Sequence, residues 1–224
     1  DRSAQDFAFT PADWYKALAA QTFVDGKLVA NTVSSWDQVN PAFAKQEIVA
    51  YVPGTKHGTR EVFVEKVIQE GCEATGALKA MTDALGKEEA LKACTTLRTD
   101  GRSVDIDGDY TETLARIQSN KAGIGVFGLS FYEQNTNTLK VATMDGVVPS
   151  VQSISTGEYP VSRPLFFYVK KQHIGQIPGL LEFTEFFVSD DIAGEGGPLA
   201  QYGLVPDPKL ADTQAAVASQ AIMN

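Results

Sequence analysis

Short apolar runs and amphipathic segments alternate along the chain, which predicts alternating strands and helices. Residues 47–52 (Glu-Ile-Val-Ala-Tyr-Val) form an apolar run of strand length. A cluster of glycine, proline and polar residues follows it. An amphipathic helix is then expected to begin at Thr59 and to end at Gly71, a residue type common just after a helix. The order strand, glycine-rich loop, helix is typical of an α/β fold.

The rest of the chain carries the same two signals. Thr10 and Pro11 are typical of a helix N-cap and first helical position, and Asp109 opens a segment with capping-box spacing. Prolines in the extended segment 159–169 favour an edge strand or a crossover between units. Further helices are expected over 10–20, 73–93 with a break near 86, 109–120, 177–188 and 213–222; strand segments are expected at 122–132, 139–142 and 147–148.

Composition narrows the class of protein. The chain has 224 residues, 43% of them hydrophobic and 21% charged, which are globular values. Its net charge is 19 − 28 = −9 and its basic residues are scattered, which argues against nucleic-acid binding. No apolar run approaches the roughly 18 residues of a membrane span, so direct membrane insertion is not expected. Because the chain begins at Asp1, we expect that a leader or a larger piece has been removed upstream.

The strongest candidate for chemistry is the start of the Thr59 helix. Free backbone N–H groups and the helix dipole at such a start favour an anion, and Gly58 allows close approach to the backbone. The Thr59 hydroxyl and the Arg60 guanidinium add donors suited to an oxyanion. The pattern is not a Walker A loop. The alternative is an ordinary helix start that Thr59 caps.

Other residue patterns do not support a metal, a cofactor or catalysis. His57 and His173 are the only histidines, and neither has a ligand-type neighbour at metal-site spacing. The acidic run at 105–109 lacks the glycine and glutamate positions of a calcium loop, and 128–132 lacks the second glycine of a nucleophile elbow. The spacing of the two cysteines leaves a disulfide and two buried thiols equally open.

Four stretches occur in an order typical of one family. They are 9–18 with Trp-Asp-Gln-Val-Asn-Pro at 36–41, His-Gly-Thr-Arg-Glu-Val-Phe at 57–63, the glycine-rich 122–128, and 159–169. The second is similar to a Ser-Gly-Thr-Arg-x-x-Phe helix start, the third to a glycine-rich strand, and the fourth to a segment that crosses between lobes. Together they resemble the periplasmic phosphate-binding proteins that feed the high-affinity phosphate ABC importer.

The resemblance implies a periplasmic-binding-protein fold of type II, with two α/β lobes joined by crossover strands and an anion in the cleft. Residues 1–155 would be the second lobe, and 156–224 the crossover strand and the C-terminal part of the first. The implied phosphate ligands are His57, Gly58, Thr59 and Arg60, while Arg163 would be a cleft or hinge residue. His57 departs from the family serine, and the N-terminal part of the first lobe, with its anion loop and proton-accepting aspartate, has no counterpart.

The implied function is capture of inorganic phosphate outside the cytoplasm, without a catalytic step, for a membrane permease. A periplasmic location would favour a Cys72–Cys94 disulfide between the ends of two helices. The alternatives are a receptor for sulfate, molybdate or an organic phosphate, a phosphate-ester hydrolase, and an adhesive or regulatory module. We also expect the chain alone to bind phosphate poorly. Its apolar residues 165–167 would be incompletely buried, so we expect the chain either to dimerise through this surface or to have a disordered tail.

Overall fold

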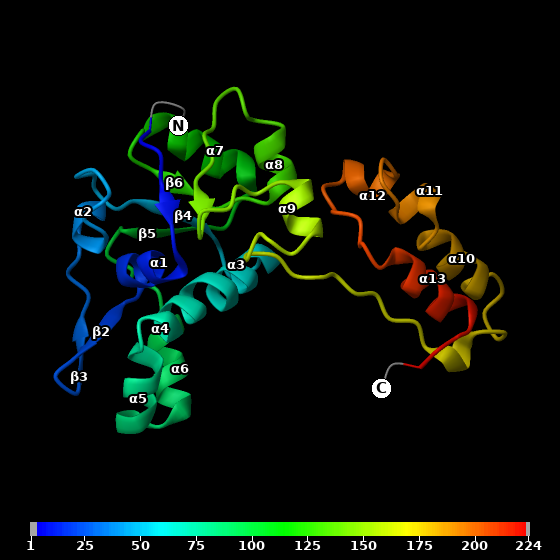
Figure 1. Ribbon diagram of the computed structural model, residues 1–224, viewed down its shortest axis with the longest axis horizontal. Coiled ribbons are helices and arrows are strands. Elements are labelled where there is room, and N and C mark those ends of the chain that lie inside the picture. Colours follow the sequence, from blue (N-terminus) through cyan, green and yellow to red (C-terminus); the bar gives the residue numbers. More distant parts are fainter. Residues whose placement is uncertain (1–3, 223–224) are drawn as a thin grey trace. The chain divides into compact units, whose positions relative to one another are not determined.

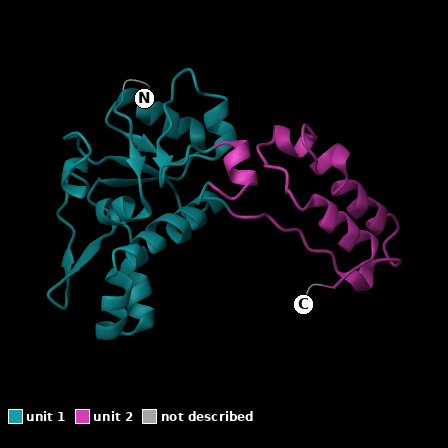
Figure 2. Ribbon diagram, viewed as in Figure 1, with its two compact units in different colours: residues 1–149, 159–162 teal, residues 150–158, 163–224 magenta. Residues whose placement is uncertain are grey.

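The computed structural model describes residues 4–222, which divide into two compact units (Figure 1). Unit 1 comprises residues 1–149 and 159–162, and unit 2 comprises residues 150–158 and 163–224 (Figure 2). Helices and short strands alternate in unit 1, whereas the described part of unit 2 is built of short helices and loops. The α/β class expected from the sequence is confirmed.

Unit 1 is organised around a parallel sheet in which β4 (Ala50–Pro53) lies between β5 (Ser103–Ile106) and β6 (Ile124–Gly125). The first residue of β4 pairs with the first residues of both neighbours. Every residue of β4 is buried, as expected for the middle strand of a sheet covered on both faces. The apolar run at 47–52 therefore overlaps the strand, but ladder pairing begins only at the fourth residue of the run and continues to Pro53.

Two short strand pairs complete the strands of unit 1. β1 (Ala8–Phe9) runs parallel to β7 (Thr143–Met144), and β2 (Gln21–Val24) forms an antiparallel hairpin with β3 (Lys27–Ala30). The helical segments of unit 1 are α1 (Pro11–Leu18), α2 (Trp36–Val39), α3 (Gly58–Phe63), the π-helix η1 (Val64–Gln69), α4 (Glu70–Ala74), α5 (Ala77–Leu85), α6 (Lys87–Thr95), α7 (Tyr110–Ser119) and α8 (Leu129–Glu133).

The strands expected at 139–142 and 147–148 are wrong, because the strand β7 lies between them. Met144 instead donates its backbone N–H to the Val147 carbonyl across a turn. Met144 pairs opposite Phe9, which is 1% exposed, so burial of Phe9 selects the residues that form the partner of β1. A strand of only two residues has too short a hydrophobic pattern to be located from the sequence. The strand expected over 122–132 is likewise short, since β6 ends at 125 and α8 follows.

Two helix starts form as their sequences predict. The Thr10 hydroxyl accepts a hydrogen bond from the Asp13 backbone N–H at 3.2 Å, and Asp13 accepts one from the Thr10 backbone N–H at 2.9 Å. These reciprocal bonds form the capping box of α1. Asp109 caps α7 by accepting from the Thr111 backbone N–H at 2.9 Å. Both helices therefore begin where local side-chain chemistry satisfies their first N–H groups.

The helix that follows β4 is longer than expected. Its segments α3, η1 and α4 follow one another without a break from residue 58 to residue 74, so the predicted end at Gly71 is wrong. The chain leaves the helix at Gly76, whose φ is +77°. Gly71 is buried against α1, where a Cβ atom would lie 2.1 Å from the Pro11 carbonyl oxygen. This glycine therefore permits close contact between two helices.

We expect Gly71→Ala to lower the free energy of unfolding by about 2 kcal/mol, because the added methyl group must push α4 away from the backbone of α1. Urea unfolding followed by circular dichroism measures the change. Glu73→Ala, an exposed position on the same helix, is the control and should change stability by less than about 0.5 kcal/mol. Equal stability of the two variants would contradict the close-contact role of Gly71.

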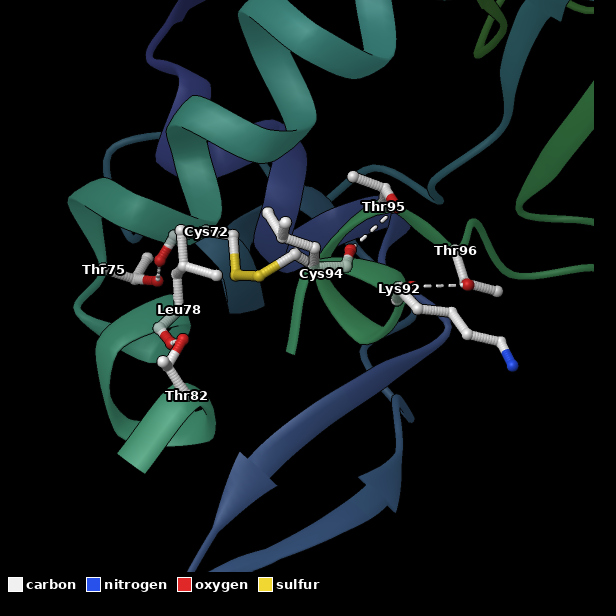
Figure 3. Close-up of a disulfide and its surroundings, with 9 residues drawn as sticks. Cys72, Thr75, Leu78, Thr82, Lys92, Cys94, Thr95 and Thr96 are labelled. Carbon is white, nitrogen blue, oxygen red and sulfur yellow. Dashed lines mark hydrogen bonds between the residues drawn. A yellow bond between two sulfur atoms is a disulfide. The ribbon is translucent and has the colours of Figure 1, made fainter. Parts of the chain in front are cut away.

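The two helices α5 and α6 form a pair separated by Gly86, as the sequence indicated. A disulfide joins Cys72 in α4 to Cys94 in α6, with a Cα–Cα distance of 5.7 Å (Figure 3). Both cysteines are fully buried, so the bridge lies inside the unit rather than on its surface. The disulfide is confirmed, and the alternative of two buried thiols is wrong.

The sheet has a core on each face. The larger core contains an aromatic cluster in which Phe9 packs against Trp14 with ring centroids 4.9 Å apart, and Trp14 packs against Phe63 at 5.4 Å. The smaller core holds Tyr51 and Ile106, with apolar residues of α7 and the 139 region. Burial on both faces explains why the central strand is apolar at every position.

Unit 2 exposes an unusual amount of apolar surface. Its helical elements are α9 (Val151–Ser155), the 3₁₀ helix η2 (Lys171–His173), α10 (Leu180–Phe187), α11 (Asp190–Ala193), α12 (Pro198–Gln201) and α13 (Leu210–Ala218). Leu165 and Phe166 are 69% and 66% exposed, and residues 163–169 belong to no strand. Within the described part of unit 2, Val188 is the only fully buried apolar side chain. Association through this surface stays a prediction.

The last helix begins and ends earlier than the 213–222 expected. Asp207 accepts hydrogen bonds that form the turn before α13, and Gln220, with φ of +50°, follows the end of the helix. The helix expected over 177–188 is present as α10, which begins later, at Leu180, and ends at Phe187. None of the helices among residues 4–222 has the length and apolar character needed to cross a bilayer.

Candidate functional site

The carboxyl edge of the β5–β4–β6 sheet collects the starts of three helices. The strands run parallel, so their carboxyl ends meet along one edge, and the chain turns from each into a helix: α3 after β4, α7 after β5 and α8 after β6. Loops at the carboxyl edge of an open parallel sheet are where ligands of α/β proteins bind. The helix starts add partial positive charge there.

The sequence-predicted residues His57, Gly58, Thr59 and Arg60 all lie at this edge, at the start of α3. His57 is the N-cap residue, and its side chain makes no capping bond. Among residues 4–222, no acceptor is found for the backbone N–H groups of Gly58 and Thr59. Gly58 is exposed and Thr59 is half-buried. Two N–H groups are therefore available at the start of a continuous helical run.

The Thr59 hydroxyl does not cap the helix, so the alternative in which Thr59 serves as a cap is wrong. Its Oγ1 atom lies 2.6 Å from the phenolic Oη of Tyr110, the first residue of α7. The Tyr110 ring packs against Phe127 at 5.7 Å and Phe131 at 5.4 Å between ring centroids. Sequence reasoning missed Tyr110, because the only signal was its place after the Asp109 cap.

The Arg60 side chain is largely buried at this edge and is fixed by hydrogen bonds. Its Nη1 donates to the Pro53 carbonyl oxygen at 2.9 Å and to Asp105 Oδ1 at 2.7 Å, and its side chain is 14% exposed. Through these two bonds the Arg60 side chain links the end of β4 to β5. Asp105 was not singled out as a partner, since nothing in the sequence shows that two residues 45 positions apart lie close together. Arg60 keeps two other donor nitrogens, Nε and Nη2.

Acidic groups border the candidate anion site. The Gly54 backbone N–H donates to the Ile106 carbonyl at 2.8 Å, and a Cβ atom at position 54 would lie 2.1 Å from Asp107 Oδ1. The His57 Nε2 atom is 3.4 Å from the Asp107 carbonyl oxygen. Hydrogen bonds from Thr111 hold the pKa of Asp109 below its ordinary value. The edge therefore combines helix-start donors with carboxylates, one of which neutralises Arg60.

Two other expectations concern Arg163 and a metal site. Arg163 belongs to unit 2, and its role as a cleft or hinge residue stays a prediction. Within residues 4–222, no group of three or more His, Cys, Asp or Glu side chains is arranged to hold a metal ion. The acidic run at 105–109 instead supplies the Arg60 partner and the cap of α7.

Comparison with known proteins identifies a family and several relatives of this chain. A family model described as "PBP superfamily domain" matches residues 1–191. The protein named "Phosphate-binding protein PstS" of Staphylococcus saprophyticus is 29% identical over 188 residues, covering 82% of this chain and 49% of that protein. "Protein SphX" of Synechocystis is 27% identical, covering 89% of this chain and 52% of its own length. The chain thus spans about half the length of these relatives.

The fold is shared with a solved structure. The crystal structure described as a possible phosphate binding protein from Planctomyces limnophilus superposes with a TM-score of 0.60 at 22% identity, covering 96% of this chain and 65% of that one. The α/β binding-protein fold expected from the sequence is therefore confirmed. Because the family model matches well over half of the residues, and the fold agrees, the chain belongs to the PBP superfamily.

Proposed function

We propose that this chain forms one wall of an inorganic-phosphate site in an extracytoplasmic solute-binding protein that supplies an ABC importer. The observation that carries the proposal is the pair of N–H groups of Gly58 and Thr59 at the carboxyl edge of the sheet, for which residues 4–222 supply no acceptor. The relatives named as phosphate-binding proteins support the choice of anion. The buried disulfide supports an oxidising location such as a periplasm.

In this proposal the chain supplies parts of two lobes. Residues 1–155 would form the second lobe, and residues 156–224 the crossover segment and the C-terminal share of the first lobe. The permease of the importer would contact the assembled protein, and Arg163 would lie at the cleft or hinge. Binding and release require fixed donors and lobe movement, and no bond of the anion is broken.

The donors divide into two kinds. The backbone N–H groups of Gly58 and Thr59 and the Thr59 hydroxyl contact the anion directly. Arg60 contributes its Nε or Nη2 atom while Nη1 stays on Asp105 and Pro53. Pairing with Asp105 reduces the net charge that Arg60 brings, but it also orients the guanidinium. His57, placed beside the helix start, is the weakest of the ligands in this arrangement.

Titration of phosphate into the ¹⁵N-labelled 224-residue chain tests the site. The amide resonances of Gly58 and Thr59 should shift saturably, with weak affinity because this chain supplies only one wall. Chloride at matched ionic strength should leave these resonances in place, and sulfate separates phosphate selectivity from general oxyanion binding. Equal shifts with chloride, or no phosphate-dependent shift at Gly58 and Thr59, would overturn the proposal.

Arg60→Ala should weaken phosphate binding in the same titration by about 2 kcal/mol, because the anion loses a charged donor and Asp105 is left unpaired. Arg116→Ala is the matched control, since Arg116 pairs with Glu112 on the exposed face of α7. The double variant Arg60→Ala/Asp105→Ala separates the two causes. Affinity that returns fully in the double variant would show that Arg60 only neutralises Asp105.

A further inference from the structure

Two hydroxyl groups meet beside the candidate anion site. Thr59 Oγ1 and Tyr110 Oη are 2.6 Å apart, and they come from helices that follow neighbouring strands, 51 residues apart in sequence. Each hydroxyl carries one proton and can accept hydrogen bonds. The bond between them therefore has two possible directions, and the direction decides what Thr59 offers to a ligand.

The Tyr110 hydroxyl is the fixed member of the pair. Its ring is clamped by the rings of Phe127 and Phe131. The backbone at Gly128 also lies close, since a Cβ atom there would be 3.6 Å from the Tyr110 ring. Tyr110 is in addition the first residue of α7, directly after the Asp109 cap. Thr59, whose hydroxyl turns about a single side-chain bond, must adjust to the tyrosine rather than the reverse.

Proton counting gives the consequence for binding. If Thr59 donates to Tyr110, its only proton is used and an approaching oxyanion meets a lone pair. If Tyr110 donates to Thr59, the Thr59 proton is free, and it can be donated to the same anion that the Gly58 and Thr59 N–H groups contact. An anion with unprotonated oxygens favours the second direction.

The geometry points to Tyr110 as a positioning residue of the anion site, which donates to Thr59 and thereby directs the Thr59 hydroxyl proton at the bound oxyanion. This inference rests on the proposed function, since it needs an anion at the start of α3. It adds a residue that does not itself contact the ligand. The ligand class it favours is an oxyanion that presents an acceptor oxygen to Thr59.

The test is Tyr110→Phe, which keeps the clamped ring and removes only the hydroxyl. We expect the dissociation constant for phosphate, from the amide titration, to rise about fivefold while the melting temperature stays unchanged. In a Thr59→Val background the same substitution should have no further effect, whereas in Thr59→Ser, which keeps a hydroxyl, the effect should return. Tyr132→Phe on α8 is the matched control and should bind as the wild type does.

A spectroscopic readout reports the bond direction itself. With tyrosine labelled at ¹³Cζ, phosphate should shift the Tyr110 resonance in the wild type and not in Thr59→Val, because only Thr59 links the phenol to the anion. Two outcomes would overturn the role of Tyr110 and leave the phosphate site intact. Tyr110→Phe could bind phosphate as tightly as the wild type, or it could lose as much affinity in the Thr59→Val background as it does in the wild type. Absence of phosphate-dependent shifts at Gly58 and Thr59 in the wild type would overturn both.

Discussion

Replacing Arg98 with alanine is expected to lower the free energy of unfolding by about 4 kcal/mol. The Arg98 side chain is 5% exposed and donates to three backbone carbonyls: Nη1 to Ala17 at 3.1 Å and to Val33 at 2.7 Å, and Nη2 to Asn31 at 3.0 Å. It also forms a two-pronged pair with Asp100, with distances of 2.9 and 2.6 Å. Truncation leaves these carbonyls without their charged donor, and an unsatisfied buried acceptor is costly.

Two further variants make the Arg98 experiment specific. Arg116→Ala removes an arginine that is 53% exposed and should cost less than about 1 kcal/mol. Arg98→Lys keeps the charge but cannot reach all the acceptors, so its stability should fall between the wild type and Arg98→Ala. Urea unfolding monitored by circular dichroism gives all the values. Arg98→Ala as stable as Arg116→Ala would contradict the network.

The Arg98–Asp100 pair also makes the free energy of unfolding depend on pH. The hydrogen bond from Arg98 lowers the pKa of Asp100 in the folded protein below its ordinary value. A carboxyl group with a lowered folded pKa contributes stability above its unfolded pKa of about 3.9, and this contribution is lost as the pH falls through the folded pKa. Asp100→Asn should therefore flatten the loss of stability below about pH 4. Parallel acid unfolding curves for wild type and variant would contradict this.

Removing the disulfide should lower the free energy of unfolding by about 3 kcal/mol, the amount expected for a bridge that closes a loop of this length. Cys72 and Cys94 are 22 residues apart, and the loop between them contains α5 and α6. Without the bridge, the unfolded chain gains freedom and the α5–α6 pair loses its covalent tie to α4. The double variant Cys72→Ala/Cys94→Ala, unfolded in urea, measures the loss.

Reductant provides the control for the disulfide. It should destabilise the wild type by a similar amount and leave the double variant unchanged, since that variant has no bridge to reduce. Thiol titration of the denatured, unreduced wild type should detect no free thiols. Two titratable thiols, or a double variant as stable as the oxidised wild type, would contradict the stabilising role of the bridge.

The features that the sequence determined by itself are those that depend on neighbouring residues. Thr10 and Asp109 begin helices because their side chains satisfy nearby N–H groups, and Gly86 separates two helices where the backbone needs a positive φ. The apolar run ending at Val52 has strand length and nothing but apolar residues after Glu47, which is enough to indicate a buried strand. The donor groups at the start of the helix that holds Thr59 follow from the same local logic.

Contacts between distant segments were decided only by the tertiary structure. Arg60 meets Asp105, and Thr59 meets Tyr110, because β4 and β5 are neighbours in the sheet, and no local pattern encodes that pairing. Gly71 looked like a helix end, but its missing side chain serves contact with a helix some sixty residues earlier. The acceptors of Arg98 come from α1 and from the segment that follows β3, for the same reason. Local sequence specifies where elements begin, whereas a side chain's partner is specified by the fold that brings distant segments together.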